Sequence, residues 1–399
     1  MFWELPGPRR FVAEILDSLE RQSHVLVLLP RTLGRTGLHT ELERGVRGRA
    51  LGELTVLLTD GSDPDPLDLL VARCGFRAAT VEELLFDPFR PSRFLLLDDP
   101  GTSTAETWHE FLRRAASHTQ VVGRSEVQFV VLVPGLGKPV VDDVFLSVHP
   151  WWGRLTQLDV DWATESRLSE LPPASAAARY WIRALCRGLA VCDPVLASVL
   201  VEACPRGLQE LTEVVARLDL FDGTPAIETN ELPGVADRFR LAGLPSDGPM
   251  HRLWNEGLLD WQEDHGPVVL TRGLVARGDE VELRRRLWRG QLEVFMPIVE
   301  RARLEVCGYL EQIHGGRWEG VLCRRAGLYE DGDVASEIGS LARLAGALKH
   351  SGHPLAPTVR RAIFGWRDIR NELAHWRPVT FDAFEEAVEA SDCLLMSTG

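Results

Sequence analysis

The sequence has almost no lysine, and this absence changes how its positive charge is interpreted. Only Lys138 and Lys349 occur, so arginine supplies nearly all of the 44 basic residues among 399. Such a bias is typical of a GC-rich coding sequence, and abundant arginine is therefore not by itself a sign of phosphate binding. With 58 acidic residues the net charge is −14, so the surface as a whole repels nucleic acid. Any contact with RNA or DNA has to come from a local basic patch.

The sequence also lacks long hydrophobic runs, paired cysteines and the pattern of a secretory signal. Its longest apolar runs, such as residues 25–29 and 129–133, are strand-sized and far below the ~20 residues that span a bilayer. The seven cysteines are scattered, with no Cys-x2-Cys pair and no histidine at metal-ligand spacing. They indicate buried apolar residues in a reducing compartment rather than zinc ligands. We expect a cytoplasmic protein with no membrane span and no metal site.

The first 170 residues alternate apolar runs with helical patterns, which is typical of a parallel α/β sheet. The strand-like runs are residues 24–29, 54–58, 93–99 and 128–133. The first run is followed by a loop that contains Gly34 and then by a helix, and the third run ends in Asp98 and Asp99. This order of parts is that of P-loop NTPases, whose loop holds phosphates while an acid on a later strand orients magnesium or water.

The loop departs from the phosphate-binding pattern G-x-x-x-x-G-K-[ST]. It matches at Gly34 and Thr36, but it has Arg35 for the lysine and Leu29 for the first glycine. The first glycine permits a backbone conformation that leucine resists, and arginine is bulkier than lysine between phosphates. With the residues 149–152 after the fourth strand, this outline resembles an inactivated form of the STAND class of AAA-related signalling NTPases.

That resemblance implies five candidate nucleotide-binding residues. They are Gly34, Arg35, Thr36, Asp98 and Asp99. Because the loop is degenerate, we expect no cofactor, neither ATP nor magnesium. The alternative is that Gly34 serves a tight turn and that the two acids cap the following helix.

Residues 171–279 form the predicted middle of the chain, with helices and then a candidate β-wing. Helical patterns cover residues 174–188, 193–204 and 208–221, and residues 253–261 and 266–270 are compatible with the last helix and wing of a winged helix. A lid followed by a winged helix is the order expected for this NTPase class. The residues around Trp261 are acidic, which favours a structural wing over one that reads DNA.

Residues 280–399 contain no strand signals and predict an all-helical domain. The expected helices are residues 282–313, 334–349, 358–374 and 380–395. Arg370 and His375, at the end of the third, have Arg-x4-His spacing. About one such pair is expected by chance among so many arginines, and the α/β region contains a second, Arg113 and His118. Context favours the first pair, because Asn371 follows the arginine and the helix ends at His375 in an all-helical domain.

This segment resembles the signature of the HEPN family of all-helical ribonucleases. The resemblance implies a metal-independent endoribonuclease with a composite site at a homodimer interface. His375 would be the general acid or base, Arg370 would stabilise charge on the phosphoryl oxygens, and Asn371 would position substrate or histidine. Arg370 and His375 lie about 140° apart around a helix axis, so they need not converge within one chain, whereas two such helices across a two-fold axis could bring both sets into one cleft.

Several alternatives stay open at the level of sequence. Arg361, Arg367 and Arg377 outweigh the local acids and are candidate RNA contacts, but Arg370 could instead pair with an acid while His375 caps the helix. The combination of domains resembles prokaryotic conflict proteins, which implies a toxin or antiviral defence effector regulated by its NTPase-like region. Two other functions remain possible. The chain could be a non-catalytic adaptor whose two ends serve dimerisation and the binding of a protein partner, or it could be an ATP-driven switch.

Overall fold

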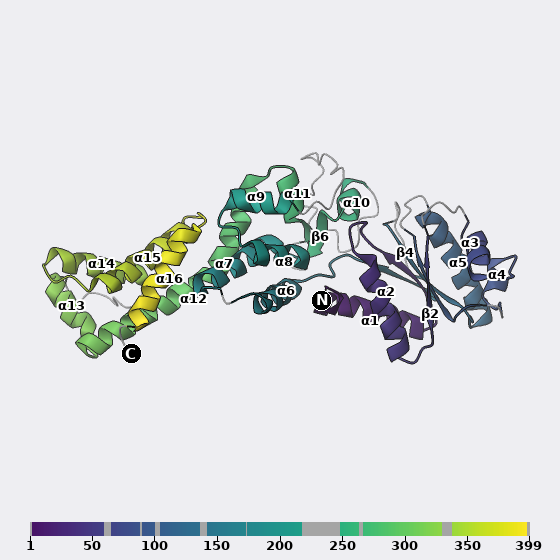
Figure 1. The fold of residues 1–399 in the computed structure, drawn as a ribbon, viewed down its shortest axis with the longest axis horizontal. Coiled ribbons are helices and arrows are strands. Elements are labelled where there is room, and N and C mark those ends of the chain that lie inside the picture. The colour runs from purple at the N-terminus through teal and green to yellow at the C-terminus, as the bar shows by residue number, and fades with distance from the viewer. Residues whose placement is uncertain are drawn as a thin grey trace. The chain divides into compact units, whose positions relative to one another are not determined.

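The computed structural model describes most of the chain as two compact units (Figure 1). The described residues are 2–59, 65–87, 90–99, 104–135, 142–172, 174–217, 248–262, 266–328 and 337–396. The first unit comprises Met1–Asp159 with Leu220–Gly273, and the second comprises Val160–Asp219 with Leu274–Gly399. The predicted middle of the chain is thus divided between the two units. The finer division into an NTPase-like domain, a lid with a winged helix and a helical domain stays a prediction.

The first unit is built on a five-stranded, all-parallel sheet. Its strands are β1 (His24–Leu28), β2 (Leu54–Leu58), β3 (Phe94–Asp98), β4 (Gln128–Val133) and β5 (Leu146–Pro150). Their order is β2-β3-β4-β1-β5, and every neighbouring pair is parallel. The four predicted strands are confirmed. The fifth had no sequence signal of its own, because its alternation of apolar and polar residues is short and ends in Pro150.

Helices cover this sheet and carry the connections between its strands. They are η1 (Phe2–Glu4), α1 (Pro6–Glu20), α2 (Arg35–Gly48), α3 (Pro66–Cys74), α4 (Val81–Leu84) and α5 (Ala105–Val122). The strands β1, β3 and β4 are buried along their whole length, as is usual where helices cover both faces of a parallel sheet. In register, Leu28 pairs with Val133 and Asp98 with Leu132, so the carboxyl ends of these strands meet at one edge.

The first unit also contains the helix and hairpin that follow residue 247. These elements are α10 (Gly248–Asn255), β6 (Leu259–Gln262) and β7 (Gly266–Val269), and the two strands pair antiparallel. The predicted wing strand is therefore present. The acidic residues 263 and 264, on which part of the argument against DNA rested, lie outside the described residues.

The second unit is helical throughout its described residues. Its helices are α7 (Ala176–Leu185), the π-helix η2 (Cys186–Ala190), α8 (Pro194–Ala203), α9 (Leu208–Ala216), α12 (Glu280–His314), α13 (Trp318–Ala326), α14 (Ile338–His350), α15 (Pro357–Ala374) and α16 (Phe381–Met396). Two further helices, α6 (Gln157–Glu170) and α11 (Thr271–Ala276), span the residues at which the units divide. The predicted long helix is confirmed as α12, and α13 was not predicted.

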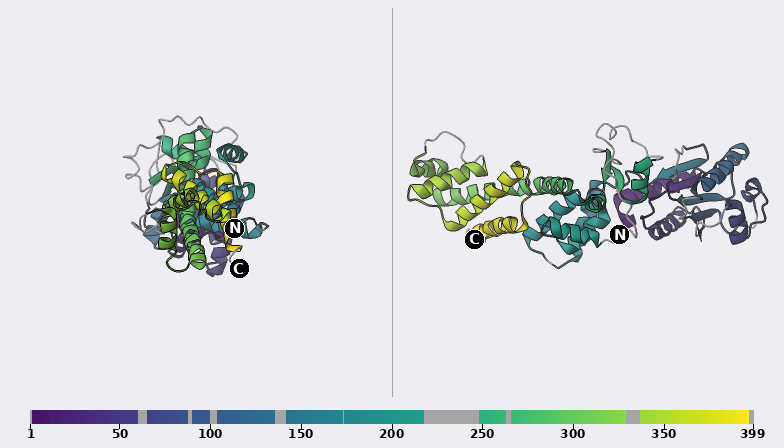
Figure 2. Two further views of the ribbon diagram at one scale, coloured as in Figure 1. Left: turned by 90° about the vertical axis from the view of Figure 1, so that its left-hand side faces the viewer. Right: turned by 90° about the horizontal axis from the view of Figure 1, so that it is seen from above.

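Aromatic side chains join α12, α15 and α16 into one core. The Phe295 and Phe384 rings stack with centroids 4.0 Å apart, and Trp366 meets Phe384 edge-on. Trp366 donates from its indole N–H to Ser391 Oγ, which satisfies the one polar atom of this buried ring. In Figures 1 and 2, α15 packs along α16 and α12, and the end of α15 reaches Trp288 in the N-terminal part of α12. The core thereby fixes the position of the end of α15.

Candidate functional site

The loop after β1 holds the predicted phosphate-binding residues at the start of α2. Gly34 precedes the helix with φ −64° and ψ 106°, a conformation open to any residue, and Arg35 is the first residue of α2. Thr36 is exposed. The structure therefore gives Gly34 no conformational reason to be glycine, and no side chain or backbone atom lies within 4 Å of an added Cβ.

Arg35 turns into the sheet edge and pairs with Asp98 at the end of β3. Its Nη1 lies 2.5 Å from Asp98 Oδ1, and the same nitrogen donates to the backbone oxygen of Asp99 at 3.2 Å. His39 Nε2 lies 2.9 Å from the other carboxylate oxygen of Asp98. Burial works to raise the pKa of Asp98, but the hydrogen bonds and charges of His39 and Arg35 outweigh it and hold the pKa below its usual value.

Asp99 is also occupied by a protein group. The Trp108 indole N–H on α5 donates to Asp99 Oδ2 at 2.6 Å, and both side chains are buried. Asp98 and Asp99 therefore have partners within the first unit. The arginine, the two acids, His39 and Trp108, which we call the closed cluster, form a buried structural network.

The backbone of the loop is likewise used by the fold. The Arg31 N–H donates to the carbonyl of Asn255 at 2.8 Å, and the Leu33 N–H donates to the carbonyl of Pro30. Gly257, with φ +65°, approaches so closely that an added Cβ would lie 2.2 Å from Thr32 Oγ1. Two backbone donors of the loop are thus satisfied by protein carbonyls, whereas a phosphate-binding loop needs its donors directed at the ligand.

The end of α15 brings Arg370 and Asn371 together on a half-exposed surface. Arg370 Nη1 lies 3.4 Å from Asn371 Oδ1, and Arg370 Nη2 lies 3.8 Å from Glu337 Oε2. The Arg370 side chain is 42% exposed and that of Glu337 65%, so this pair is loose and solvated. Arg370 is thus near an acid but is not committed to it.

His375 ends the helix with its backbone and leaves its side chain exposed. Its N–H donates to the carbonyls of Asn371 and Glu372, so the backbone, not the imidazole, caps the helix. Within the described chain, the imidazole has no hydrogen bond or ion pair. Among the described residues, no hydrogen bond or ion pair joins the His375 side chain to Arg370, in agreement with their separation around the helix axis. Within one chain, Arg370 is therefore bonded to Asn371 but not to the imidazole.

The turn after His375 has the hydrogen bonds of a Schellman motif. The Arg377 N–H donates to the carbonyl of Glu372 at 3.0 Å, and the Trp376 N–H to that of Leu373 at 3.3 Å. Trp376 has φ 62°, the left-handed conformation in which this motif usually places glycine. For a residue with a Cβ that conformation costs roughly 1–2 kcal/mol.

The Trp376 ring stacks on Trp288 of α12. Their centroids lie 4.4 Å apart with planes 16° from parallel, and the Trp288 indole N–H donates to the carbonyl of Leu373 at 2.7 Å. Such a pair contributes about 0.5–1.5 kcal/mol, which offsets much of the backbone cost. Trp376 nevertheless remains 70% exposed. We call Arg370, Asn371, His375 and Trp376 the open cluster.

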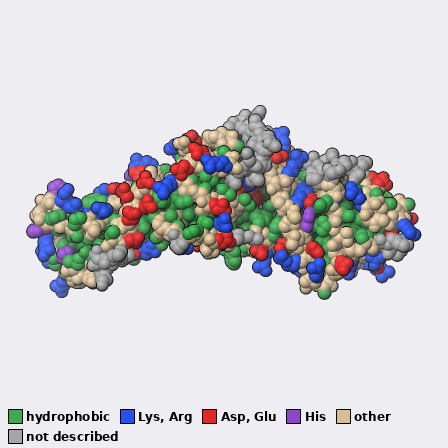
Figure 3. Space-filling view, in the orientation of Figure 1, with side chains coloured by type: hydrophobic (Ala, Val, Ile, Leu, Met, Phe, Trp, Pro, Cys, Tyr) green, Lys and Arg blue, Asp and Glu red, His purple; other side chains and the backbone are tan. Residues whose placement is uncertain are grey.

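The arginines predicted to contact RNA differ in their surroundings. Arg367 pairs with its neighbour Asp368 at 2.5 Å and Arg377 pairs with Glu372 at 2.9 Å, whereas Arg361 is exposed and has no ion pair among the described residues. Pairs this exposed contribute little to stability and exchange readily for another anion. On the face drawn in Figure 3, acidic and basic side chains are interspersed over both units.

The second Arg-x4-His pair has the structural surroundings of a helix face. Arg113 is exposed on α5, and the His118 ring packs edge-on against Phe86 with centroids 6.0 Å apart. The pair lies on a helix that covers the sheet, and the neighbouring Arg114 pairs with Glu82. This pair therefore serves as an internal control for the first.

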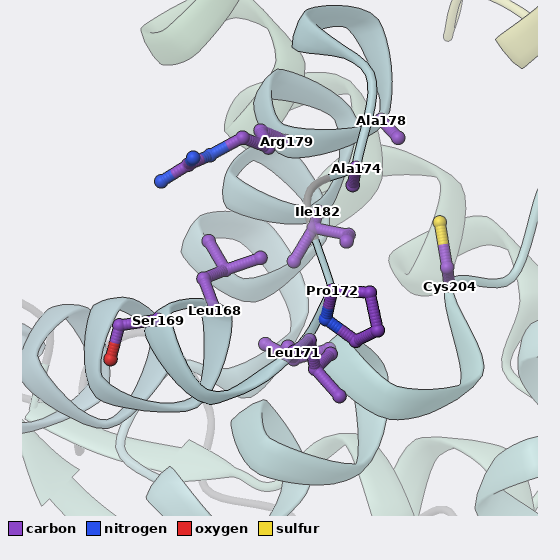
Figure 4. A pocket seen from close by; sticks show the side chains of 10 residues that line it. Leu168, Ser169, Leu171, Pro172, Ala174, Ala178, Arg179, Ile182 and Cys204 are labelled. Carbon is purple, nitrogen blue, oxygen red and sulfur yellow. The ribbon is translucent and has the colours of Figure 1, made fainter.

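A separate pocket of about 610 Å³ lies in the second unit. It is lined mainly by apolar side chains, shown in Figure 4, including Leu168, Leu171 and Ile182, with Cys204 beside them. Arg179 extends away from these side chains, and no acid or histidine lines the space. Burial raises the pKa of the Cys204 thiol, which keeps it protonated and unreactive.

Sequence reasoning missed the residues that decide between the two clusters. His39 could have been found, since it follows Arg35 by four residues and so shares its helix face. Trp288 gave no signal, because its partner Leu373 lies 85 residues further along the chain, and the bond of Trp108 to Asp99 depends on how α5 packs against the end of β3. In the described parts of the chain there is no group of three metal-ligating side chains, and no helix is long and apolar enough to cross a membrane.

No protein-family model matches the chain, and a search of curated proteins gives no match either.

Proposed function

We propose that the chain is a metal-independent endoribonuclease whose reactive groups are those of the open cluster. The observation that carries this proposal is the state of His375, an exposed imidazole with no partner in the described chain, one turn beyond Arg370 and Asn371. A general acid or base has to reach its substrate, and an exposed imidazole whose nitrogens are not engaged within the described chain can do so. The type of reaction that we propose is the one implied by the resemblance to HEPN ribonucleases.

In the proposed reaction, the 2′-hydroxyl of a ribose attacks the adjacent phosphate. His375 accepts the hydroxyl proton as the 2′-oxygen forms its bond to phosphorus, and the bond to the 5′-oxygen breaks as that oxygen takes up a proton from an acid in the site. The products are a 2′,3′-cyclic phosphate and a 5′-hydroxyl. Arg370 stabilises the charge that develops on the phosphoryl oxygens, and Asn371 orients substrate or histidine.

Pairing of two chains completes the site in this proposal. Arg370 bonds to Asn371 and pairs with Glu337, and among the described residues no hydrogen bond or ion pair joins it to His375, so we assign the phosphate at each arginine to the histidine of the other chain. Two α15 helices related by a two-fold axis would bring each histidine toward the other chain's arginine. We propose a homodimer through the C-terminal helices for this reason.

The sheet unit has no catalytic role in this proposal. Its P-loop-like outline supports a domain of NTPase ancestry, and the closed cluster supports a structural or regulatory part in a defence effector. A non-catalytic adaptor is the second candidate. It is favoured for this unit because the polar groups of the closed cluster bond to one another. An ATP-driven switch is the weakest candidate, because Arg35 and both acids are occupied; absence of an ATP-induced shift in melting temperature would reject it.

The test is cleavage of RNA by the purified full-length protein in EDTA, with analysis of product ends. His375→Ala and Arg370→Ala are expected to lower the rate by about 10²–10⁴-fold, the usual contribution of a general acid or base. His118→Ala, in the matched pair on α5, should leave it unchanged. Retained cleavage in both variants of the open cluster would reject the assignment, and an inactive wild-type protein would favour the adaptor.

A further inference from the structure

We propose that Trp376, supported by Trp288, is a stacking platform for one unpaired nucleobase of the RNA that the open cluster cleaves. This inference rests on the proposed function and adds to it a specificity residue that selects single-stranded substrate. It is carried by the geometry of two stacked tryptophans, Trp288 on α12 and the highly exposed Trp376 in the turn after α15, next to His375.

One face of the Trp376 ring is open. Trp288 covers the other face, with centroids 4.4 Å apart and the planes 16° from parallel. The residue remains 70% exposed despite this contact, so the free surface is the opposite ring face and the edges. A planar group can add to this stack as its third member, which is the geometry of base–aromatic stacking.

The Trp376 ring is held by the stack with Trp288 at a backbone position suited to glycine. Trp376 occupies the left-handed residue of the Schellman motif, and the Trp288 indole is anchored to the carbonyl of Leu373. Glycine would adopt this backbone conformation with less strain, so the backbone does not explain why a tryptophan stands at this position; its side chain does. A ring fixed by α12 and α15 together loses little freedom when a base binds.

Exposed arginines lie close to both tryptophans in the sequence, and such neighbours suit a nucleotide better than an apolar protein surface. Arg377 follows it directly, and Arg284 lies one helical turn before Trp288 on α12. Both side chains are more than 60% exposed and make only surface ion pairs, with Glu372 and Glu280. Such pairs exchange for phosphates at little cost, and aromatic rings interleaved with exposed arginines bind single strands.

Stacking on the platform requires a base that is free of its neighbours. Bases in a duplex are already stacked and paired, and their faces are hidden from a protein ring, so the platform discriminates against double-stranded RNA. A base held on Trp376 places its own backbone beside His375, the preceding residue. The platform thus positions the scissile phosphate as well as choosing the strand.

The experiment measures binding of fluorescein-labelled 2′-O-methyl RNA, which lacks the attacking hydroxyl and is not cleaved. Trp376→Gly keeps the backbone of the turn and removes the ring, and it should weaken binding of the single strand by about five- to a hundredfold. Trp376→Phe should recover most of the affinity. Trp162→Ala, which removes another exposed tryptophan, 58% exposed on α6, should leave binding unchanged.

An abasic scan of the same oligonucleotide isolates the stacking contact. In the wild type, loss of one particular base should weaken binding as much as Trp376→Gly does, and in Trp376→Gly the same loss should have no further effect. Unchanged affinity in Trp376→Gly, or no sensitive position in the wild type, would overturn the proposal. A dimer that dissociates in Trp376→Gly with unaltered RNA affinity would assign the ring to a second copy of the chain instead.

Cleavage of ordinary RNA, measured in parallel, separates this inference from the proposed function. Cleavage that depends on His375 together with binding insensitive to Trp376 would reject the platform alone. Binding that depends on Trp376, with no cleavage by the wild type, would reject the ribonuclease and leave the platform.

Discussion

The two clusters of charged and polar residues in this chain are opposites in how they satisfy their own groups. In the closed cluster, Arg35 is directed at Asp98, and Trp108 at Asp99, on a buried sheet edge. In the open cluster, Arg370 has a long hydrogen bond to Asn371 and a loose ion pair with Glu337, and the His375 side chain has no partner in the described residues. Both clusters resemble motifs with a chemical function, but only the open one presents unsatisfied groups to solvent. The two clusters therefore differ in whether their side chains are free to bind a ligand, not in the spacing of their residues in the sequence.

The largest difference between the two clusters is expected in protein stability, when one carboxylate of the closed cluster is removed. Asp98→Ala leaves a buried guanidinium without its partner and should lower the free energy of unfolding by about 3 kcal/mol. Glu43→Ala, which removes an exposed pair with Arg47 on the same helix α2, should cost less than about 1 kcal/mol. Denaturant titration of the full chain measures both. Loss of RNA cleavage without loss of stability in Asp98→Ala would give that cluster an active role.

Acid should affect the two regions differently because of a buried histidine in β1. Burial lowers the pKa of His24 to about 3 from its ordinary 6.5. Below pH 6.5 His24 is protonated in the unfolded chain but stays neutral in the folded chain. The free energy of unfolding therefore decreases as the pH is lowered, until the pKa of the folded state is reached. The loss at pH 5 is about 2 kcal/mol.

The measurement is the free energy of unfolding between pH 7 and pH 4 in the wild type and in His24→Leu. The slope should flatten in the variant, whatever its stability at pH 7. Asp98 acts in a lower window, because its lowered pKa gives a contribution that is present above about pH 4 and lost as pH falls further. An unchanged slope in His24→Leu would show that His24 is not the group responsible.

The smallest effect is expected where the open cluster meets its supporting helix. Trp376→Gly loses the stack with Trp288 but relieves the left-handed backbone of a residue with a Cβ. The two terms are similar in size, so the free energy of unfolding should change by less than about 1 kcal/mol. Thermal unfolding measures it. A loss much above that would mean that the ring serves the core, which would weaken its assignment to a ligand.

Much of the fold could be predicted from local patterns, and less of the site. Buried strands such as 24–28 and 94–98 are continuous apolar runs, and α12 has an unbroken helical stripe, so periodicity suffices for them. The fifth strand and α13 are short and have mixed composition, and they exist because neighbouring elements cover them. The pairing of Arg35 with Asp98 spans 63 residues, and only the sheet register brings the two together.

The open cluster shows the same limit. Arg370, Asn371 and His375 could be selected from spacing and context, but the sequence does not reveal which of two Arg-x4-His pairs has free groups. Trp288 on α12 and Trp376 in the turn after α15 are 88 residues apart, and their stack depends on how α12 and α15 pack. No local pattern contains that information.

The most direct test of the account is complementation between two inactive variants. Arg370→Ala and His375→Ala are each assayed for RNA cleavage in EDTA, alone and after mixing and reassembly in equal amounts. If arginine from one chain acts with histidine from the other, random pairing gives half mixed dimers with one intact site in two, and about a quarter of wild-type activity returns. A mixture no more active than its components would contradict a composite site at the end of α15.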